Sequence, residues 1–486
     1  MSQQIIYLLP VLIPILLSIL IKTTWEVQQL RYPILLSGPI LALWSVYKIQ
    51  QNSDFLSYSI NIFDIFPNIG ISLGLEPISF VFIIMVNSLW LVATLYSYGY
   101  MLTNNEERLG NFFSFFAIAI GCANGAALSS NLLTLFIFYE LLTISTYPLV
   151  THKGDDQSKQ SGRKYLLILL GTSLCFFLPA IGYVYFLSGN LDFVSGGLLT
   201  TTLSDLEVNN IAISILLVLF IFGISKAAVM PFHAWLPAAM VAPTPVSALL
   251  HAVAVVKVGV FSIIKVLVYT FGLDILLGIF TVDLMIYICG FTIITTSIIA
   301  LKQDNLKKLL AYSTISQLSY VVIAILILTP SAIIAASMHL VAHAVSKITL
   351  FFAAGAIYSS TGYTKISEMD GIGKKLKVVS IAFTLGAMSL VGIPLLVGFT
   401  SKWYIVQSSV EVGHWFILLI ITTSTLLNIG YFTPIIYKFF FKKDLGEASF
   451  KTLPRDINLS IIICCALMVI LFLQPNLVME VISNVK

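Results

Sequence analysis

Long apolar runs separated by short polar segments dominate the pattern of this chain. A run of about twenty apolar residues is the length that an α-helix needs to cross the ~30 Å hydrocarbon core of a bilayer. By this criterion the sequence predicts about fourteen spans, near residues 4–21, 32–48, 77–97, 112–129, 130–151, 163–187, 208–237, 241–270, 274–300, 305–328, 331–358, 376–408, 413–440 and 457–484. The predicted fold class is an all-α polytopic membrane protein.

Spans seven and twelve, at residues 208–237 and 376–408, are longer than a straight helix needs and contain residues that interrupt helices. The interrupting residues are Pro231 and Pro237 in span seven and Gly392, Pro394 and Gly398 in span twelve. Backbone groups freed by such breaks cannot face lipid, so they are buried in protein or line a wet cavity. Both helices are therefore predicted to be broken, next to a hydrated path near mid-membrane.

The broken spans occupy equivalent places in two sets of five, counted from span four and from span nine. Because five is an odd number, two such sets would be inverted repeats. The predicted organisation is N-terminal helices over 1–111, a first five-helix repeat over 112–270, a second over 271–440 and a C-terminal helix over 441–486.

Composition agrees with this class: 58% of residues are hydrophobic and only 10% are charged, against a charged fraction of about 25% in soluble proteins. The first apolar run has no basic segment before it and no small-residue cleavage site, so it is predicted to be a retained span. The five cysteines show no metal-ligand spacing and are interpreted as core residues.

Basic residues are distributed unevenly between the two sides. Nineteen of the 26 Lys and Arg residues lie in the segments after odd-numbered spans, whereas the loops after even-numbered spans carry mainly Asp and Glu. By the positive-inside rule the odd-numbered loops are cytoplasmic. Both termini are then expected on the outer, periplasmic side of a cell inner membrane.

Five lysines remain at membrane depth, where a charge is costly and usually serves a pathway or relay. They are Lys226, Lys257, Lys265, Lys347 and Lys402. Glu140, in the middle of span five, is the predicted partner of Lys226, and the distance between them could set proton occupancy. A fixed salt bridge is the alternative reading.

His339, His343 and Lys347 are spaced i, i+4 and i+8, so they share one face of span eleven, about 6 Å apart along its axis. This stripe predicts a proton wire, because histidine exchanges protons near neutral pH. His251 and Lys257 on span eight are expected to link the two repeats, and Lys402 follows the second break.

Other polar residues have weaker interpretations. Lys265 is read as a side chain that snorkels to the outer surface. Asp283 is either an outer exit group or a helix–helix hydrogen bonder, and His233 either lines the broken segment or caps freed carbonyls. His152 and His414 are expected to be solvated loop residues.

The sequence lacks a GxGxxG, a Walker loop, a GxSxG and any Cys or His cluster suited to haem or iron–sulfur. We therefore predict no catalytic residue, no cofactor, no metal site, no nucleic-acid binding and no enzymatic activity of the chain by itself.

Several segments together resemble a known family, the antiporter-like subunits shared by Mrp-type cation/proton antiporters, complex I (NADH:quinone oxidoreductase) and membrane-bound hydrogenases. The resemblance rests on FYELLTISTYPLV, SKAAVMPFHAWLPAAMVAPTPVSALLHAVAVVKVG, DNLKKLLAYSTISQLSYV, HLVAHAVSKITLFFAAGAI and GIPLLVGFTSKWYI. It implies that Glu140 matches the family's fifth-helix glutamate, Lys226 its seventh-helix lysine, Lys257 its eighth-helix lysine and Lys402 its twelfth-helix residue. The stripe on span eleven matches the family's titratable stripe.

The resemblance implies a proton-translocating subunit that assembles with other membrane subunits. The chain looks most like the D subunit of an Mrp-type Na⁺(K⁺)/H⁺ antiporter, and a proton-pumping subunit of a complex I type oxidoreductase or hydrogenase is the alternative. An independent solute transporter and a structural scaffold are rival classes. The sequence leaves open the host complex, the direction of proton flow and whether Na⁺ or K⁺ passes through this chain.

Overall fold

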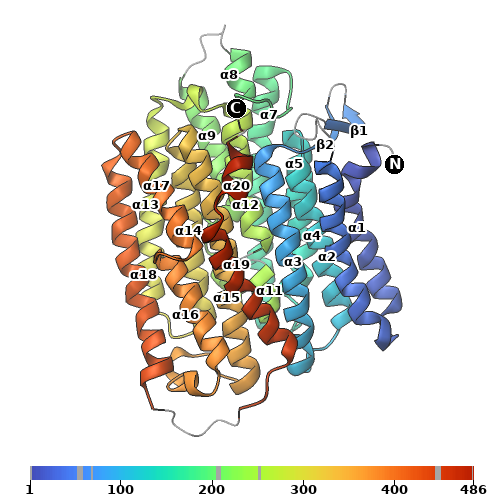
Figure 1. Cartoon of the computed structure of the whole chain (residues 1–486). Coiled ribbons are helices and arrows are strands. Elements are labelled where there is room, and N and C mark those ends of the chain that lie inside the picture. The colour runs from blue at the N-terminus through green and yellow to red at the C-terminus, as the bar shows by residue number, and fades with distance from the viewer. Residues whose placement is uncertain are drawn as a thin grey trace.

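The computed structural model describes residues 3–51, 59–66, 69–203, 210–249, 253–443, 450–483 and 485. Its helices run side by side in one bundle, with both termini at the same end (Figure 1). Within the described residues, eleven helices are long and apolar enough to cross a membrane. The chain is a multi-pass membrane protein.

The helices of the N-terminal part follow the predicted runs closely. They are α1 (Gln3–Thr24), α2 (Gln28–Gln50), α3 (Pro77–Thr103), α4 (Leu109–Leu128), α5 (Leu132–Val150), α6 (Asp156–Thr172), the π-turn η1 (Ser173–Phe177), α7 (Leu178–Ser188) and the short α8 (Leu198–Leu203). The helix that contains α6 begins before the expected residue 163, because Asp155 accepts a hydrogen bond from the Ser158 N–H at 2.7 Å and caps its first turn.

The helices of the C-terminal part are α13 (Phe280–Leu301), α14 (Leu306–Leu326), α15 (Pro330–Thr361), α18 (Trp415–Phe441), α19 (Arg455–Leu473) and α20 (Asn476–Ile482). The last apolar run was expected to form one helix over 457–484. It is instead divided at Pro475, which lacks the backbone N–H that would continue α19.

Three further predicted spans consist of shorter pieces. The first contains α9 (Asn210–Gly223), η2 (Ser225–Ala227), α10 (Trp235–Ala238) and η3 (Ala239–Val241). The second contains α11 (Thr244–Ala248), α12 (Val255–Lys265) and η5 (Val266–Phe271), and the third contains α16 (Lys377–Val391) and α17 (Val397–Glu411). Division of the second, over 241–270, was not expected from the sequence.

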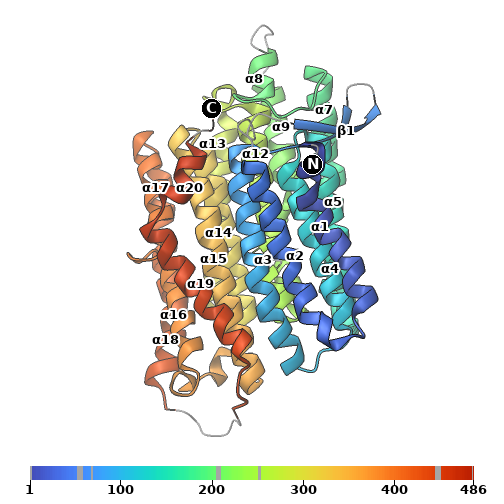
Figure 2. The same cartoon turned by 45° about the vertical axis from the view of Figure 1, so that its right-hand side comes forward.

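A two-stranded antiparallel sheet of β1 (Ser59–Phe66) and β2 (Ile69–Gly74) is an addition to the expected all-helical fold. It lies at the same end of the bundle as the two termini (Figure 2). The Asn131 amide donates to the Gly70 carbonyl at 2.9 Å, and the Ser72 N–H donates to the Thr134 hydroxyl at 3.0 Å. These bonds fasten the sheet to the start of α5.

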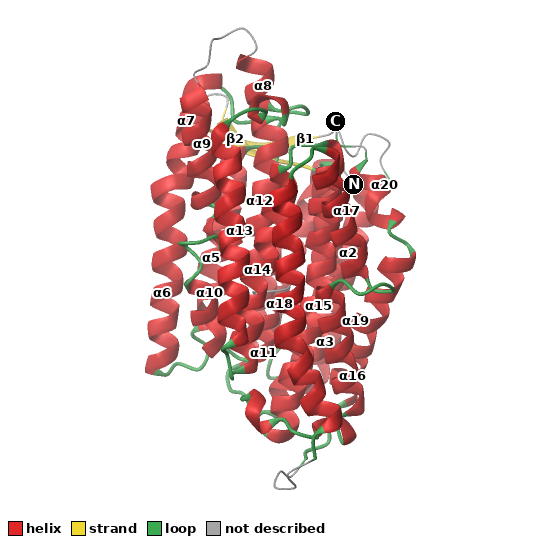
Figure 3. Ribbon diagram, turned by 90° about the vertical axis from the view of Figure 1, so that its left-hand side faces the viewer, coloured by secondary structure: helices red, strands yellow, loops and turns green. Residues whose placement is uncertain are grey.

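The core is centred on α15, which packs against α14, α16 and α17 as well as α3, α11, α12 and α19. Every residue in its most apolar stretch is buried, whereas fewer than half of the residues in the corresponding stretches of the outer helices α1, α2, α18 and α19 are buried. Figure 3 shows the bundle from another side. Titratable side chains on α15 are therefore shielded by protein from lipid. Of the cysteines expected in the core, Cys175 is exposed and Cys465 is half-buried.

Candidate functional site

The interruption after α9 carries a lysine into the interior of the bundle. Beyond Gly223 the chain turns through η2, where Lys226 is fully buried. The Lys226 backbone N–H donates to the Tyr139 hydroxyl on α5 at 3.1 Å. A backbone group freed by the break is thus satisfied inside the protein, as it must be away from water.

Two glycines permit close packing at this turn. A Cβ atom on Gly223 would lie 2.5 Å from the Phe177 backbone nitrogen, and one on Gly259 would lie 2.4 Å from the Lys226 carbonyl carbon. The Cβ atom of any other residue at either position would clash with the neighbouring backbone. Gly259 therefore sets α12 directly against the turn that holds Lys226.

The Lys226 ammonium group is held by α5. It donates to the Tyr139 carbonyl at 2.8 Å and to the Thr143 hydroxyl at 2.6 Å, and it lies 3.1 Å from the centroid of the Tyr139 ring. A cation over an aromatic face is attracted by the ring quadrupole. Neutral groups thus solvate this buried charge.

Glu140, the expected partner of Lys226, does not contact it. No ion pair joins these two described side chains, and both Glu140 carboxylate oxygens are buried without a hydrogen-bond partner among the described residues. A buried polar group without a partner is rare in native proteins and calls for an explanation such as an unseen water or a functional role. Glu140 and Lys226 are therefore not paired in this conformation.

Lys257 on α12 contacts His343 on α15 directly, through its ammonium nitrogen and the imidazole Nδ1. Both side chains are fully buried. One of the two atoms must carry the proton that the other accepts, because a lone pair on one nitrogen has to face a hydrogen on the other. A proton can be exchanged within this contact.

The three expected side chains on α15 lie on one face. The His339 and His343 rings stack with centroids 6.4 Å apart and an interplanar angle of 16°. His339 Nδ1 lies 3.0 Å from the Ser401 hydroxyl on α17. Lys347 instead donates to the Leu310 carbonyl on α14 at 3.1 Å.

The second interruption, between α16 and α17, also holds a lysine. The Lys402 ammonium donates to the Val391 carbonyl at the end of α16 at 3.0 Å and to the Thr425 hydroxyl at 3.2 Å. The side chain is only 7% exposed, so it is buried within the bundle. Gly392 (φ 92°) allows the turn, and Gly398 is required because a Cβ there would lie 1.7 Å from the Ser389 carbonyl oxygen.

Four of the predicted residues therefore form a chain through the interior: Lys257, His343, His339 and Lys402. The Tyr320 ring lies beside the last two, 5.4 Å from the His339 ring and 5.3 Å from the Lys402 ammonium, whereas the Ser401 hydroxyl contacts His339 and donates to the Gly398 carbonyl at 3.0 Å. His251, which was expected to belong to the same path, lies outside the described residues.

The interpretation of Lys265 as a snorkelling side chain is wrong. Lys265 is fully buried, and its ammonium lies 2.8 Å from the Glu76 carboxylate at the start of α3. It also contacts the Ser129 carbonyl and donates to the Ala127 carbonyl at 3.3 Å, both at the end of α4. Sequence reasoning missed Glu76 as a partner because 189 residues separate it from Lys265.

The remaining polar predictions have mixed outcomes. His152 is buried at 7% exposure and His414 is half-buried, so the expectation of solvated loop histidines is wrong. Asp283 Oδ1 lies 3.4 Å from His414 Nε2, so Asp283 takes part in a contact between helices. His233 is half-buried in the turn that leads to α10.

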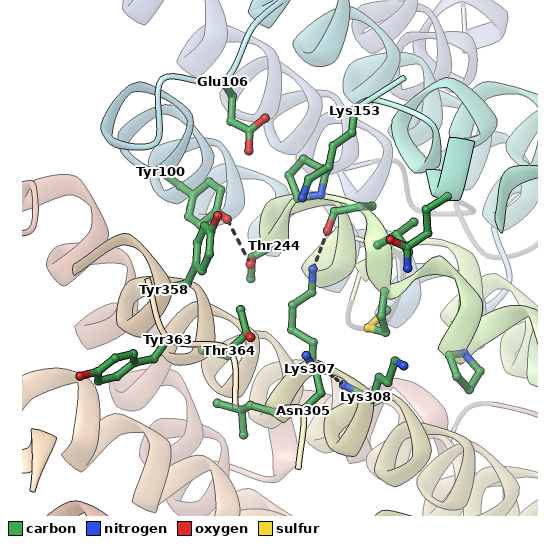
Figure 4. Close-up of a pocket in the computed structure, with 18 of the residues that line it drawn as sticks. Tyr100, Glu106, Lys153, Thr244, Asn305, Lys307, Lys308, Tyr358, Tyr363 and Thr364 are labelled. Atoms are coloured by element: carbon green, nitrogen blue, oxygen red, sulfur yellow. Dashed lines mark hydrogen bonds between the residues drawn. The ribbon is translucent and has the colours of Figure 1, made fainter. Parts of the chain in front are cut away.

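A cavity of about 350 Å³ lies at the end of the bundle opposite the termini, below the first interruption. Figure 4 shows Lys307 reaching into it and donating to the Ala242 carbonyl, with the hydrogen-bonded Tyr100 and Thr244 on another wall. Glu106 lines the same cavity, and burial raises the pKa of its carboxyl although the charges of Lys153 and Lys307 oppose this. A polar, charged vestibule thus reaches α11.

Neutral polar partners of the lysines were not predicted. Tyr139, Thr143, Ser401 and Thr425 occur in apolar runs where Ser, Thr and Tyr are common, so nothing in the sequence distinguishes them. Spacing offers one signal, because Thr143 and Tyr139 are i and i+4 on the helix of Glu140.

Comparisons with known proteins agree on one family. Residues 129–428 match the family model described as "NADH:quinone oxidoreductase/Mrp antiporter, TM". NADH-quinone oxidoreductase subunit N of Desulforudis audaxviator is 31% identical over 379 residues, which cover 77% of this chain and 74% of that protein. Na(+)/H(+) antiporter subunit A1 of Staphylococcus haemolyticus is 30% identical over 449 residues, covering 85% of this chain but 54% of its own length. The chain thus spans about half of this antiporter relative.

Solved structures share the fold. A chain of the membrane-bound sulfane sulfur reductase, an archaeal respiratory membrane complex, superimposes with a TM-score of 0.83 at 22% identity, covering 98% of this chain and 96% of that one. A chain of the Mrp complex from a Dietzia species superimposes with a TM-score of 0.84 at 18% identity, covering 99% and 97%.

Proposed function

We propose that this chain, which belongs to the NADH:quinone oxidoreductase/Mrp antiporter transmembrane family, is a proton-translocating subunit of a multisubunit membrane complex. Its relatives and structural neighbours are subunits of such complexes. The single observation that carries the proposal is the buried chain of Lys257, His343, His339 and Lys402.

The chain supports proton transfer by its chemistry. When the Lys257 ammonium gives its proton to a neutral His343 Nδ1, the imidazole becomes cationic and can release the proton held on its other nitrogen. His339 can pass a proton on in the same way, by accepting one hydrogen and donating another, across the gap beside the Tyr320 ring. Lys402 is then the acceptor at the second helix break.

Lys226 and Glu140 are proposed to control access to this chain. The cavity lined by Glu106 and Lys307 would supply protons at the side where basic residues gather. A carboxylate that approaches Lys226 favours its charged form, and one that withdraws disfavours it. Because Glu140 is not paired with Lys226, its approach or withdrawal would favour or disfavour the charged form of Lys226. Water would fill the gap between Lys226 and Lys257.

For the host complex we propose the D-type subunit of an Mrp-type Na⁺(K⁺)/H⁺ antiporter in a cell inner membrane, with both termini outside. Proton entry would then be coupled to export of Na⁺ or K⁺ through partner subunits. The second candidate is a pumping subunit of a complex I type oxidoreductase, favoured by the match to subunit N over 74% of that relative.

The test is Lys257→Met in vesicles that contain the assembled complex. Methionine keeps the length of the side chain but cannot carry a proton, so proton transport should fall by about a hundredfold or more, the range typical of a lost proton-transfer group. Lys159→Met, at an exposed lysine in the first turn of α6, is the matched control. Near-normal transport by an assembled Lys257→Met complex would refute the proposal.

The host complex is tested with the same wild-type vesicles. An antiporter moves protons when a Na⁺ or K⁺ gradient is imposed and no electron donor is present. A respiratory subunit moves them only when its complex is supplied with an electron donor and acceptor. Uptake of a solute by the single purified chain would instead favour an independent transporter.

A further inference from the structure

A second hollow lies away from the candidate pathway, at the end of the bundle opposite the termini. It encloses about 470 Å³ between the end of α15, the start of α16 and the segment that leads into α19. Four lysines line it: Lys374, Lys375, Lys377 and Lys451. Among the described residues, no Asp or Glu lines this hollow.

The walls of the hollow are held in place. The Lys451 N–H donates to the Ser360 carbonyl at 2.9 Å, and the Ser360 hydroxyl donates to the Lys451 carbonyl at 2.8 Å. The Lys375 ammonium lies 4.2 Å from the centroid of the Phe450 ring. These contacts hold the backbone of the hollow's walls against the end of α15. The side chains of the four lysines remain exposed.

The start of α16 adds hydrogen-bond donors to this positive charge. Leu376 precedes the helix and supplies no side-chain cap. In the described part of the chain, the backbone N–H groups of Lys377, Val378 and Val379 have no acceptor. Free N–H groups and the positive end of the helix dipole both favour an anion such as phosphate.

An apolar face continues from the hollow along the bundle. Ile381 lies one turn beyond Val378 on α16, and Ile462 lies one turn beyond Asn458 on α19. Val378 and Asn458 line the hollow, while Ile381 and Ile462 are 52% and 51% exposed. Since α16 and α19 pack together, these positions extend from the charged hollow onto a surface that faces acyl chains.

We propose that this hollow binds the phosphate head group of an anionic phospholipid, whose acyl chains lie along Ile381 and Ile462. Basic pockets between membrane helices on the cytoplasmic side are suited to such head groups. The site is distinct from the candidate proton pathway and needs none of its residues (the starts of α16 and α19 lie toward the lower end of Figure 1).

Binding can be measured on the purified full-length chain by native mass spectrometry of single-lipid adducts. Wild type should bind phosphatidylglycerol about tenfold or more tightly than phosphatidylcholine, because several lysines each add attraction for the anionic head group. Equal adduct formation by the two lipids would overturn the proposal without requiring any variant.

The variant K374Q/K375Q/K377Q/K451Q should lose this preference. The matched control, K22Q/K159Q/K302Q/K442Q, removes the same charge from exposed lysines that do not line the hollow. Comparable loss in both variants would mean a general surface-charge effect and would contradict a site.

Free glycerol phosphate distinguishes a lipid from a soluble phosphate compound. At equal concentration it should compete poorly with phosphatidylglycerol, and Ile381→Ser with Ile462→Ser should weaken lipid binding. Competition as strong as that of the lipid itself would overturn the lipid assignment.

Discussion

At the scale of single residues, the lysines within apolar runs are the groups whose burial costs the most free energy. They are also the groups with the most specific hydrogen-bond partners. The lysines stand out in the sequence as candidate pathway residues because a charge in an apolar run is costly and usually serves a function. Their partners could not be predicted, since Lys226 and Lys402 are solvated by carbonyls and hydroxyls that every apolar helix carries. A charged residue can be recognised in the sequence, whereas the neutral groups that solvate it are known only once the packing of the helices is known.

The Lys265–Glu76 pair gives a stability prediction. Glu76→Gln should destabilise the fold by about 3 kcal/mol, because it leaves the buried Lys265 ammonium without its counter-charge. Adding Lys265→Met should recover much of this loss. Thermal unfolding in detergent measures both, and a double variant no more stable than Glu76→Gln would show that the charge is not the cause.

His152 gives a pH dependence. Burial, together with the nearby Arg108 charge, lowers the pKa of His152 below its usual value. The folded state therefore disfavours the protonated ring, so its stability is complete above the unfolded pKa of about 6.5 and falls as the pH drops through that value.

The check is the apparent Tm of wild type and His152→Gln at pH 8 and pH 5.5. Acidification should lower the Tm of the wild type more than that of the variant, which has no ring to protonate. An equal decrease in both proteins would exclude His152 as the source.

At the scale of elements, breaks in helices were easier to predict than their geometry. Pro and Gly marked spans seven and twelve, and the structure has α9, η2 and α10 in one and α16 and α17 in the other. The division of span eight was missed because 241–270 reads as one apolar run. The assignment of inverted repeats remains a prediction.

Close packing at the first break can be tested with glycine substitutions. Gly259→Ala should destabilise the protein by about 1–3 kcal/mol, since its Cβ would lie 2.4 Å from the Lys226 backbone. Gly182→Ala, on α7, is the control because nothing lies within 4 Å of its Cβ. Comparable Tm values for the two variants would contradict close backbone packing at Gly259.

At the scale of the whole molecule, the distribution of charged loop residues predicts how the bundle is oriented in the membrane. The structure shows which loops lie at each end of the bundle. Asp192 follows α7, which lies at the end that carries the termini (Figure 1), and Lys302 follows α13 and precedes Lys307, which lines the cavity at the other end. After replacement of the exposed Cys175, Lys302→Cys should react with an impermeant maleimide only in inverted vesicles and Asp192→Cys only in right-side-out vesicles. The reverse pattern would place both termini in the cytoplasm.

The most direct test of the proposed proton path asks whether His339 and His343 act one after the other in a single path. Proton transport should be compared for wild type, His339→Leu, His343→Leu and the double variant, each in vesicles with the assembled complex. Groups that act in one path are strongly non-additive, so the double variant should transport no more slowly than the worse single variant. Independent losses that multiply in the double variant, or single variants that transport at the wild-type rate, would contradict a single proton path through α15.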